Sequence, residues 1–158
     1  MRFASLLFFT ALLIAACGGS TAGTGGGGSS GVAVDADALC NKYVTDCHQA
    51  TITLDDCKKT YVAVRVSQSC ADAIKNATCT DLTSATSSTL DTCFPTCTTS
   101  GSQTCNGDGT VTTCSSSTHT YVFDCASLCS SVLNGTYTGT CGTTFEGQTS
   151  EKPKCWCK

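Results

Sequence analysis

The chain has 158 residues, among them 15 Cys, 15 Gly and only 2 Pro, and 13% of its residues are charged. A net charge of −3 without any basic run offers no electrostatic surface for nucleic acid, so we expect no nucleic-acid partner. No apolar stretch reaches the roughly 18 residues that span a bilayer. The cysteine density is far above cytosolic usage and predicts an exported, disulfide-bonded protein.

The N-terminus has the arrangement of an export signal. A single basic residue precedes an apolar run over residues 3–16, which has the length of a signal-peptide hydrophobic region. The run ends in Ile14-Ala15-Ala16, and Cys17 follows. An aliphatic residue, two small residues and a cysteine in this order resemble the bacterial lipoprotein signal.

The resemblance implies that residues 1–16 are removed and that Cys17 is then acylated on its sulfur and amino group. Gly18 differs from the Asp of inner-membrane retention signals, so an outer-membrane location is implied, with the lipid as the membrane contact. An ordinary secretory signal with an incidental Cys17 is the alternative. Setting Cys17 apart leaves fourteen cysteines, an even number that permits seven disulfides.

The composition divides the remaining chain into a tether and two modules. Residues 17–34 hold the lipidated cysteine and a linker, and eight of residues 18–31 are Gly, which is typical of a flexible coil. Residues 35–96 predict a disulfide-bonded helical module, and residues 97–158 predict a disulfide-rich α+β module. Only 20 of the 142 residues after position 16 are Leu, Ile, Val or Phe, so disulfides must supply much of the stability.

In the helical module, apolar residues and cysteines recur at spacings of three and four, which predicts helices. Asp37 and Thr53 are the expected caps of the first two helices. A third helix is expected over residues 69–79 and a short one around 80–91. Valines alternate over residues 62–66, so a strand is the alternative to a helix there. The six cysteines of this module have fifteen possible pairings, which the sequence leaves open; they are Cys40, Cys47, Cys57, Cys70, Cys79 and Cys93.

In the C-terminal module, short alternating stretches predict strands. The Asn-Gly-Asp-Gly of residues 106–109 indicates a hairpin turn within residues 104–114. Further strands are expected over 118–124, 136–141 and 154–158. Eight cysteines complete the predicted disulfide set: Cys97, Cys105, Cys114, Cys125, Cys129, Cys141, Cys155 and Cys157.

Two cysteine pairs in this module have complementary spacings. Cys125 and Cys129 lie one turn apart on a short helix that Asp124 is expected to cap. Cys155 and Cys157 lie on one face of a strand. Two parallel bridges can therefore staple the helix to the strand. The arrangement resembles the cysteine-stabilised αβ scaffold of defensins and scorpion-type toxins.

The scaffold resemblance covers about 45 residues, from Cys114 to the end. It implies the bridges Cys125–Cys155, Cys129–Cys157 and Cys114–Cys141, with Cys97–Cys105 as an additional one. Two features depart from that family. The expected loop of 13 residues between Cys141 and Cys155 is longer than is typical, and the module has a net charge of −1 where membrane-active members are usually cationic. The alternative is an irregular, disulfide-knit β domain with one helix.

The sequence shows no recognisable catalytic constellation, because His48 and His119 lie in no nucleophile or metal motif. Closely spaced cysteines suit zinc, but export oxidises them, so we expect neither metal nor cofactor. The candidate binding residues are Trp156, Tyr121 and Tyr137, since aromatic side chains on a rigid scaffold can stack on sugars or fill a partner's pocket. The alternative is that these three residues belong to a thin core.

The predicted function is that of a lipid-anchored, exported bacterial lipoprotein. Its ectodomain is expected to be non-enzymatic and to serve in binding or in structure, with a surface protein or a glycan as partner. One alternative is a defensin- or toxin-like effector displayed at the cell surface. Another is a small hydrolase or an inhibitor of one.

Overall fold

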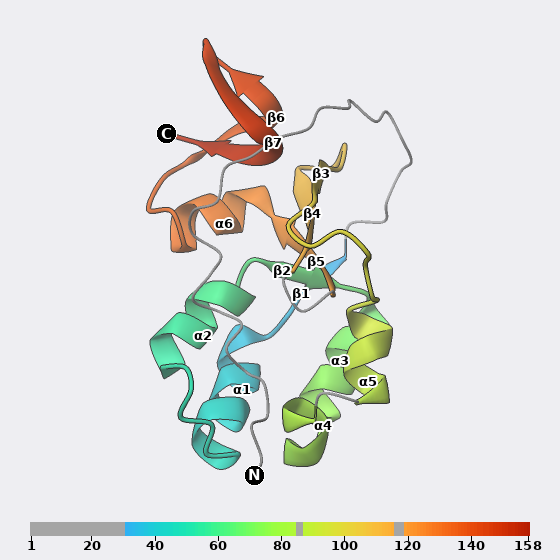
Figure 1. Cartoon of the computed structure of the whole chain (residues 1–158). Helices are drawn as coiled ribbons and strands as arrows, with labels where there is room; N and C mark the ends of the chain where they lie inside the picture. Colours follow the sequence, from blue (N-terminus) through green and yellow to red (C-terminus); the bar gives the residue numbers. More distant parts are fainter. Residues whose placement is uncertain (1–30, 85–86, 116–118) are drawn as a thin grey trace.

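The computed structural model describes residues 31–84, 87–115 and 119–158 (Figure 1). The predicted signal, Cys17 and linker residues 18–30 lie outside these residues. The end of the predicted linker is described, and Val32–Ala33 form a strand there and not a flexible coil. The described chain is a small disulfide-rich α+β structure, as the sequence predicted, with two antiparallel sheets. Its helices are α1 (Ala36–Cys40), the π-helix η1 (Asn41–Asp46), α2 (Leu54–Tyr61), α3 (Gln68–Asn76), α4 (Cys79–Thr83), α5 (Ser88–Cys93) and α6 (Cys125–Ser131).

Short polar side chains set where the helices begin. The Thr53 hydroxyl accepts a hydrogen bond from the Asp56 N–H at 3.1 Å, which confirms the predicted cap of α2. The cap of α1 is Asp35 and not Asp37: the Asp35 carboxylate accepts from the Ala38 N–H at 2.9 Å. Two aspartates stand two positions apart there, and the local sequence does not choose between them. The short helix expected around 80–91 is instead two helices, α4 and α5.

The larger sheet has five antiparallel strands in the order β1-β2-β5-β4-β3. The alternating valines, for which the sequence left a strand as an alternative, do form a strand, β2. It pairs with β5 in the register Val64↔Phe123. The predicted turn at residues 106–109 joins β3 to β4. The sheet takes strands from both sides of the predicted module boundary, whereas each disulfide stays on one side of it. Its strands are β1 (Val32–Ala33), β2 (Val64–Val66), β3 (Gln103–Cys105), β4 (Thr110–Cys114) and β5 (Thr120–Asp124).

The second sheet is the hairpin of β6 (Tyr137–Phe145) and β7 (Gln148–Cys157). The stretch between Cys141 and Cys155, which the sequence suggested was a long loop, continues both strands. The strands meet in a turn at Glu146 and Gly147, with φ of 47° and 80°; two positive φ angles suit the twist of a tight hairpin. The hairpin stands at one end of the molecule, away from α1 and α4 (Figure 1).

The core lies between the five-stranded sheet, α3 and α6. Four of the twelve buried residues in its main cluster are half-cystines, so sulfur fills space that leucine or isoleucine fills in a larger core. This agrees with the low aliphatic content of the sequence. The cluster consists of Val34, Ala63, Val64, Val66, Cys70, Ile74, Phe94, Val111, Phe123, Cys125, Cys129 and Cys155.

Candidate functional site

Two disulfides fasten α6 to β7. Cys125 bonds to Cys155 and Cys129 bonds to Cys157, which confirms both bridges of the predicted staple. The helix begins where the sequence predicted, because the Asp124 carboxylate accepts a hydrogen bond from the Ser127 N–H at 2.7 Å. The cap and the two bridges hold α6 against one face of the hairpin.

The other two implied bridges are wrong. Cys97 bonds to Cys114, and Cys105 bonds to Cys141. The reason is the register of the β3–β4 hairpin: Cys105 pairs with Val111 near the turn, while Cys114 ends β4 at the open end. The Cys97–Cys105 pair would have to span the length of this hairpin. The specific cysteine-stabilised αβ scaffold is therefore matched in its staple but not in its third bridge.

The helical module has the pairings Cys40–Cys57, Cys47–Cys79 and Cys70–Cys93. The first joins α1 to α2, and the third joins α3 to α5. All fourteen cysteines after Cys17 are thus in disulfides, as predicted.

The hairpin face opposite Cys155 and Cys157 carries the most distinctive side-chain arrangement. The Lys154 ammonium lies 4.1 Å from the centroid of the Trp156 ring, and the Lys158 ammonium lies 5.2 Å from that of Phe145. The Phe145 and Trp156 rings are 5.9 Å apart between centroids. A cation over the face of an aromatic ring is held by the ring quadrupole. We call these four residues the Lys–aromatic face.

Within this face Trp156 is the covered member. Its side chain is only 4% exposed, and its Nε1 donates a hydrogen bond to the Gly142 carbonyl at 3.1 Å. The Trp156 ring therefore exposes very little surface for the recognition role that the sequence predicted. Phe145 and the two lysines, which the sequence analysis did not select, are more exposed. The alternation Lys154-x-Trp156-x-Lys158 could have identified the two lysines from sequence, since it puts all three residues on one strand face.

The other two candidate aromatics lie elsewhere. Tyr121 belongs to β5 and stacks on Phe94 and Phe123, with centroid distances of 4.7 and 6.2 Å. Burial raises its pKa. Tyr137 begins β6 opposite Cys157 and packs against the core cluster. Burial raises its pKa too, and the nearby Asp124 charge adds to the rise. Neither ring shares the Lys–aromatic face.

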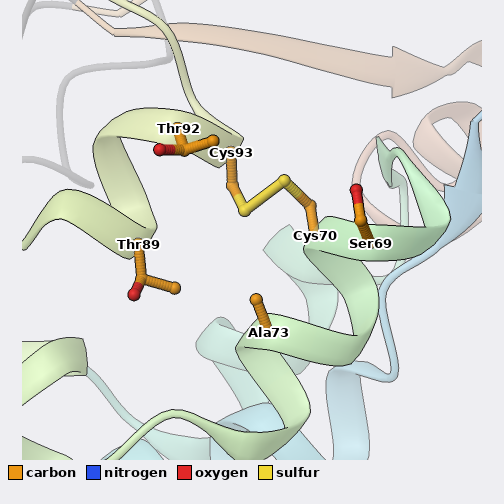
Figure 2. A pocket seen from close by; sticks show the side chains of 6 residues that line it. All are labelled: Ser69, Cys70, Ala73, Thr89, Thr92 and Cys93. Atoms are coloured by element: carbon orange, nitrogen blue, oxygen red, sulfur yellow. A yellow bond between two sulfur atoms is a disulfide. The ribbon is translucent and has the colours of Figure 1, made fainter.

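An open pocket of 290 Å³ lies between α3 and α5 (Figure 2). The Cys70–Cys93 disulfide forms part of its wall, and the remaining lining is small or hydroxylic: Ser69, Ala73, Thr89 and Thr92. No side chain in this lining is titratable at neutral pH, so the pocket offers a ligand hydroxyls and a disulfide but no charge.

The two histidines lie in different surroundings, and neither belongs to the Lys–aromatic face. His48 is exposed, with a positive φ of 53°. His119 Nε2 lies 3.2 Å from the Asp91 carboxylate and joins α5 to the approach of β5. Among the described residues, one group of three cysteine sulfurs converges to within 4.8 Å, those of Cys125, Cys141 and Cys155. All three are in disulfides and therefore offer no thiolate to a metal.

Comparison of the chain with protein-family models, with curated proteins and with solved structures gives no match.

Proposed function

We propose that this chain is an exported lipoprotein anchored through Cys17, with a non-enzymatic ectodomain that serves in binding or in structure. The observation that carries the proposal is the cysteine count. Seven disulfides use fourteen of the fifteen cysteines, and the one that remains is Cys17, at the end of the apolar run. A cysteine left over in the count when the other fourteen are paired suits a separate chemical role, such as lipidation.

The disulfides themselves support export, since such bonds form and persist in oxidising compartments. Among the described residues, no helix has the length and hydropathy to cross a membrane. In the proposed arrangement the acyl chains at Cys17 hold the protein at the outer membrane, and the glycine-rich linker separates the folded part from the lipid surface.

The Lys–aromatic face supports a binding role more than any other described surface. Two ammonium groups border Phe145 and Trp156 on the β6–β7 hairpin. Glu146, paired with Lys158 at 2.7 Å, offsets one of these charges. The two ammonium groups and the partly exposed Phe145 ring suit an anionic partner that also offers an apolar face, such as an acidic glycan of the envelope or an acidic surface protein.

The anchor is tested by metabolic labelling with an alkyne fatty acid in a Gram-negative host that expresses the full chain. We expect label on the wild type and none on Cys17→Ala. Gly18→Asp is the matched control, because it keeps the acylated cysteine and should move the labelled protein to the inner-membrane fraction. Equal labelling of wild type and Cys17→Ala would refute the anchor.

The binding role is tested on an immobilised acidic polysaccharide at low and at high salt. We expect retention of the wild type at low salt and its loss in Lys154→Gln/Lys158→Gln. The control, Lys59→Gln/Lys75→Gln, removes the same charge from exposed positions on α2 and α3. Equal loss in both double variants would attribute retention to overall charge and not to this face. No retention of the wild type would leave the structural role.

A toxin-like effector remains the second candidate because the Cys125–Cys155 and Cys129–Cys157 staple is the one its family uses. The C-terminal module shares a sheet with the helical module, so the full chain is the appropriate material. Growth inhibition of competing bacteria by the purified full chain, lost after reduction, would favour the effector over the binding role.

A further inference from the structure

Two disulfides of the C-terminal module lie side by side. The sulfur atoms of Cys125, Cys141 and Cys155 are all within 4.8 Å of one another. Cys125 and Cys155 are bonded together, whereas Cys141 is bonded to Cys105. One sulfur of the Cys105–Cys141 bond therefore lies next to both sulfurs of the Cys125–Cys155 bond.

The two bonds differ in their access to solvent. Cys125 is fully buried and Cys155 is 5% exposed, so an external reagent does not reach this bond directly. Cys105 and Cys141 are both partly exposed. Cys105 belongs to β3, the edge strand of the five-stranded sheet. In the Cys105–Cys141 bond, the Cys141 sulfur belongs to the three-sulfur cluster and the Cys105 sulfur does not.

We propose that the Cys105–Cys141 disulfide is a thiol-exchange site that passes the exchange on to the buried Cys125–Cys155 bond. The reacting partner is an external thiolate, either a low-molecular-weight thiol or a protein thiol. It attacks the Cys105 sulfur, forms a mixed disulfide with it, and expels the Cys141 thiolate.

The Cys141 thiolate then attacks the Cys155 sulfur. A Cys141–Cys155 bond forms, the Cys125–Cys155 bond breaks, and the electron pair leaves on the Cys125 sulfur. Each step forms one sulfur–sulfur bond and breaks one, so neither step needs a further oxidant or reductant. The protein carries one thiolate before and after the second step, first on Cys141 and then on Cys125.

The strand register makes Cys155 the acceptor sulfur. Cys141 and Cys155 are direct partners across the antiparallel β6–β7 pair. Directly opposed residues in such a pair have Cα atoms about 4.5–5.5 Å apart, within the range that a disulfide spans. The product therefore needs no large shift of the strands. The Cys129–Cys157 bond still holds α6 to β7, so the exchange frees only the first turn of the helix.

A single-cysteine variant tests the second step without any external thiol. In Cys105→Ser, Cys141 has no partner from the start. The full chain is purified in detergent without reductant and held at pH 8, near the ordinary thiol pKa of about 8.5. It is then alkylated and digested without reduction for peptide mapping. We expect the alkyl group mainly on Cys125 and a peptide pair joined through Cys141–Cys155.

The matched control is Cys97→Ser, which leaves Cys114 unpaired at a position outside the three-sulfur cluster. Alkylation there should stay on Cys114. Alkylation of Cys105→Ser on Cys141 alone, with Cys125–Cys155 intact, would overturn the proposal. Label on Cys155 would overturn the choice of acceptor sulfur.

Wild-type protein provides a second test should the variant fail to fold. Reduced glutathione at limiting concentration is the external thiol, and the same mapping follows. The proposal expects glutathione on Cys105 and the alkyl group on Cys125. Glutathione on Cys105 with the alkyl group on Cys141 would show exchange that stops at the first bond, and would overturn the relay.

Discussion

The guanidinium group of Arg65 lies 3.3 Å from the carboxylate of Asp124 and joins strand β2 to the start of helix α6. The same guanidinium donates a hydrogen bond to the Ser127 hydroxyl at 3.3 Å. Asp124 in turn accepts from the Ser127 N–H. These three residues tie the helix that carries the disulfide staple to a strand from the other predicted module.

This contact predicts that Arg65→Met destabilises the protein. The Arg65 and Asp124 side chains are only 18% and 26% exposed, so a lost partner leaves a partly buried carboxylate with fewer hydrogen bonds. We expect a loss of about 1–2 kcal/mol in the free energy of unfolding, measured by urea titration with the disulfides intact. The control is Lys58→Met, which breaks the more exposed pair with Asp37 and should cost well under about 1 kcal/mol. Equal losses would argue against a special role for Arg65.

Asp124 also predicts how stability depends on pH. Partial burial raises the pKa of its carboxyl, but hydrogen bonds from Ser127 and the charge of Arg65 outweigh this and hold the pKa below its ordinary value. Because the pKa is lower in the folded state, the carboxylate stabilises the fold fully at pH values above the unfolded-state pKa of about 4. The contribution is lost as the pH falls through the folded-state pKa.

We therefore expect Asp124→Asn to be less stable than the wild type at neutral pH and to lose less stability on acidification. Urea midpoints taken between neutral pH and about pH 2 measure both effects. Asp55→Asn, at an exposed position on α2, controls for the loss of one negative charge. If Asp124→Asn and the wild type lose stability in parallel, Asp124 does not contribute to the acid transition.

The Lys–aromatic face predicts a change in fluorescence, because Trp156 is the only tryptophan of the chain. Its buried ring should emit at short wavelength. Phe145→Ala removes a ring 5.9 Å away and should admit water, which shifts the emission to longer wavelength and costs about 1–3 kcal/mol. Tyr121→Ala, in the other sheet, should destabilise without this shift in the folded state. An unchanged spectrum in Phe145→Ala would mean that Phe145 does not shield Trp156.

A comparison of two disulfides that close chain segments of similar length separates the contribution of burial to stability from that of unfolded-chain entropy. The Cys129–Cys157 and Cys47–Cys79 bonds close intervals of 28 and 32 residues, so each should contribute roughly 3–4 kcal/mol by restricting the unfolded chain. Cys129 is fully buried, whereas Cys79 is exposed. We expect the Cys129→Ala/Cys157→Ala variant to lose more stability in urea than Cys47→Ala/Cys79→Ala, because it also leaves a cavity. A larger loss in the exposed pair would contradict this order.

Local features of the fold were predictable from sequence. Thr53 and Asp124 cap their helices because a short oxygen-bearing side chain before a helical pattern satisfies a free N–H group, whatever lies around it. The Asn-Gly-Asp-Gly turn reverses the chain for equally local reasons. The spacing of Cys125, Cys129, Cys155 and Cys157 fixed a shared face on each element, and the resemblance supplied the correct pairing.

Long-range features were not predictable in the same way. Nothing near Cys105 in the sequence indicates that β3 lies beside the hairpin and brings this residue to Cys141. Likewise, the Lys–aromatic face exists because β6 and β7 extend beyond the predicted strands and carry Phe145 to Trp156.

The sequence by itself determined the cysteine-rich composition, the caps of α2 and α6, the hairpin turn at residues 106–109 and the cysteine pair on each stapled element. Only the tertiary structure decided the order of the strands, the partners of Cys105 and Cys114, and the meeting of three sulfurs at Cys141. The physical reason is range. Caps, turns and side-chain periodicity depend on atoms a few residues apart, whereas strand neighbours and disulfide partners depend on which distant surfaces the whole chain buries together.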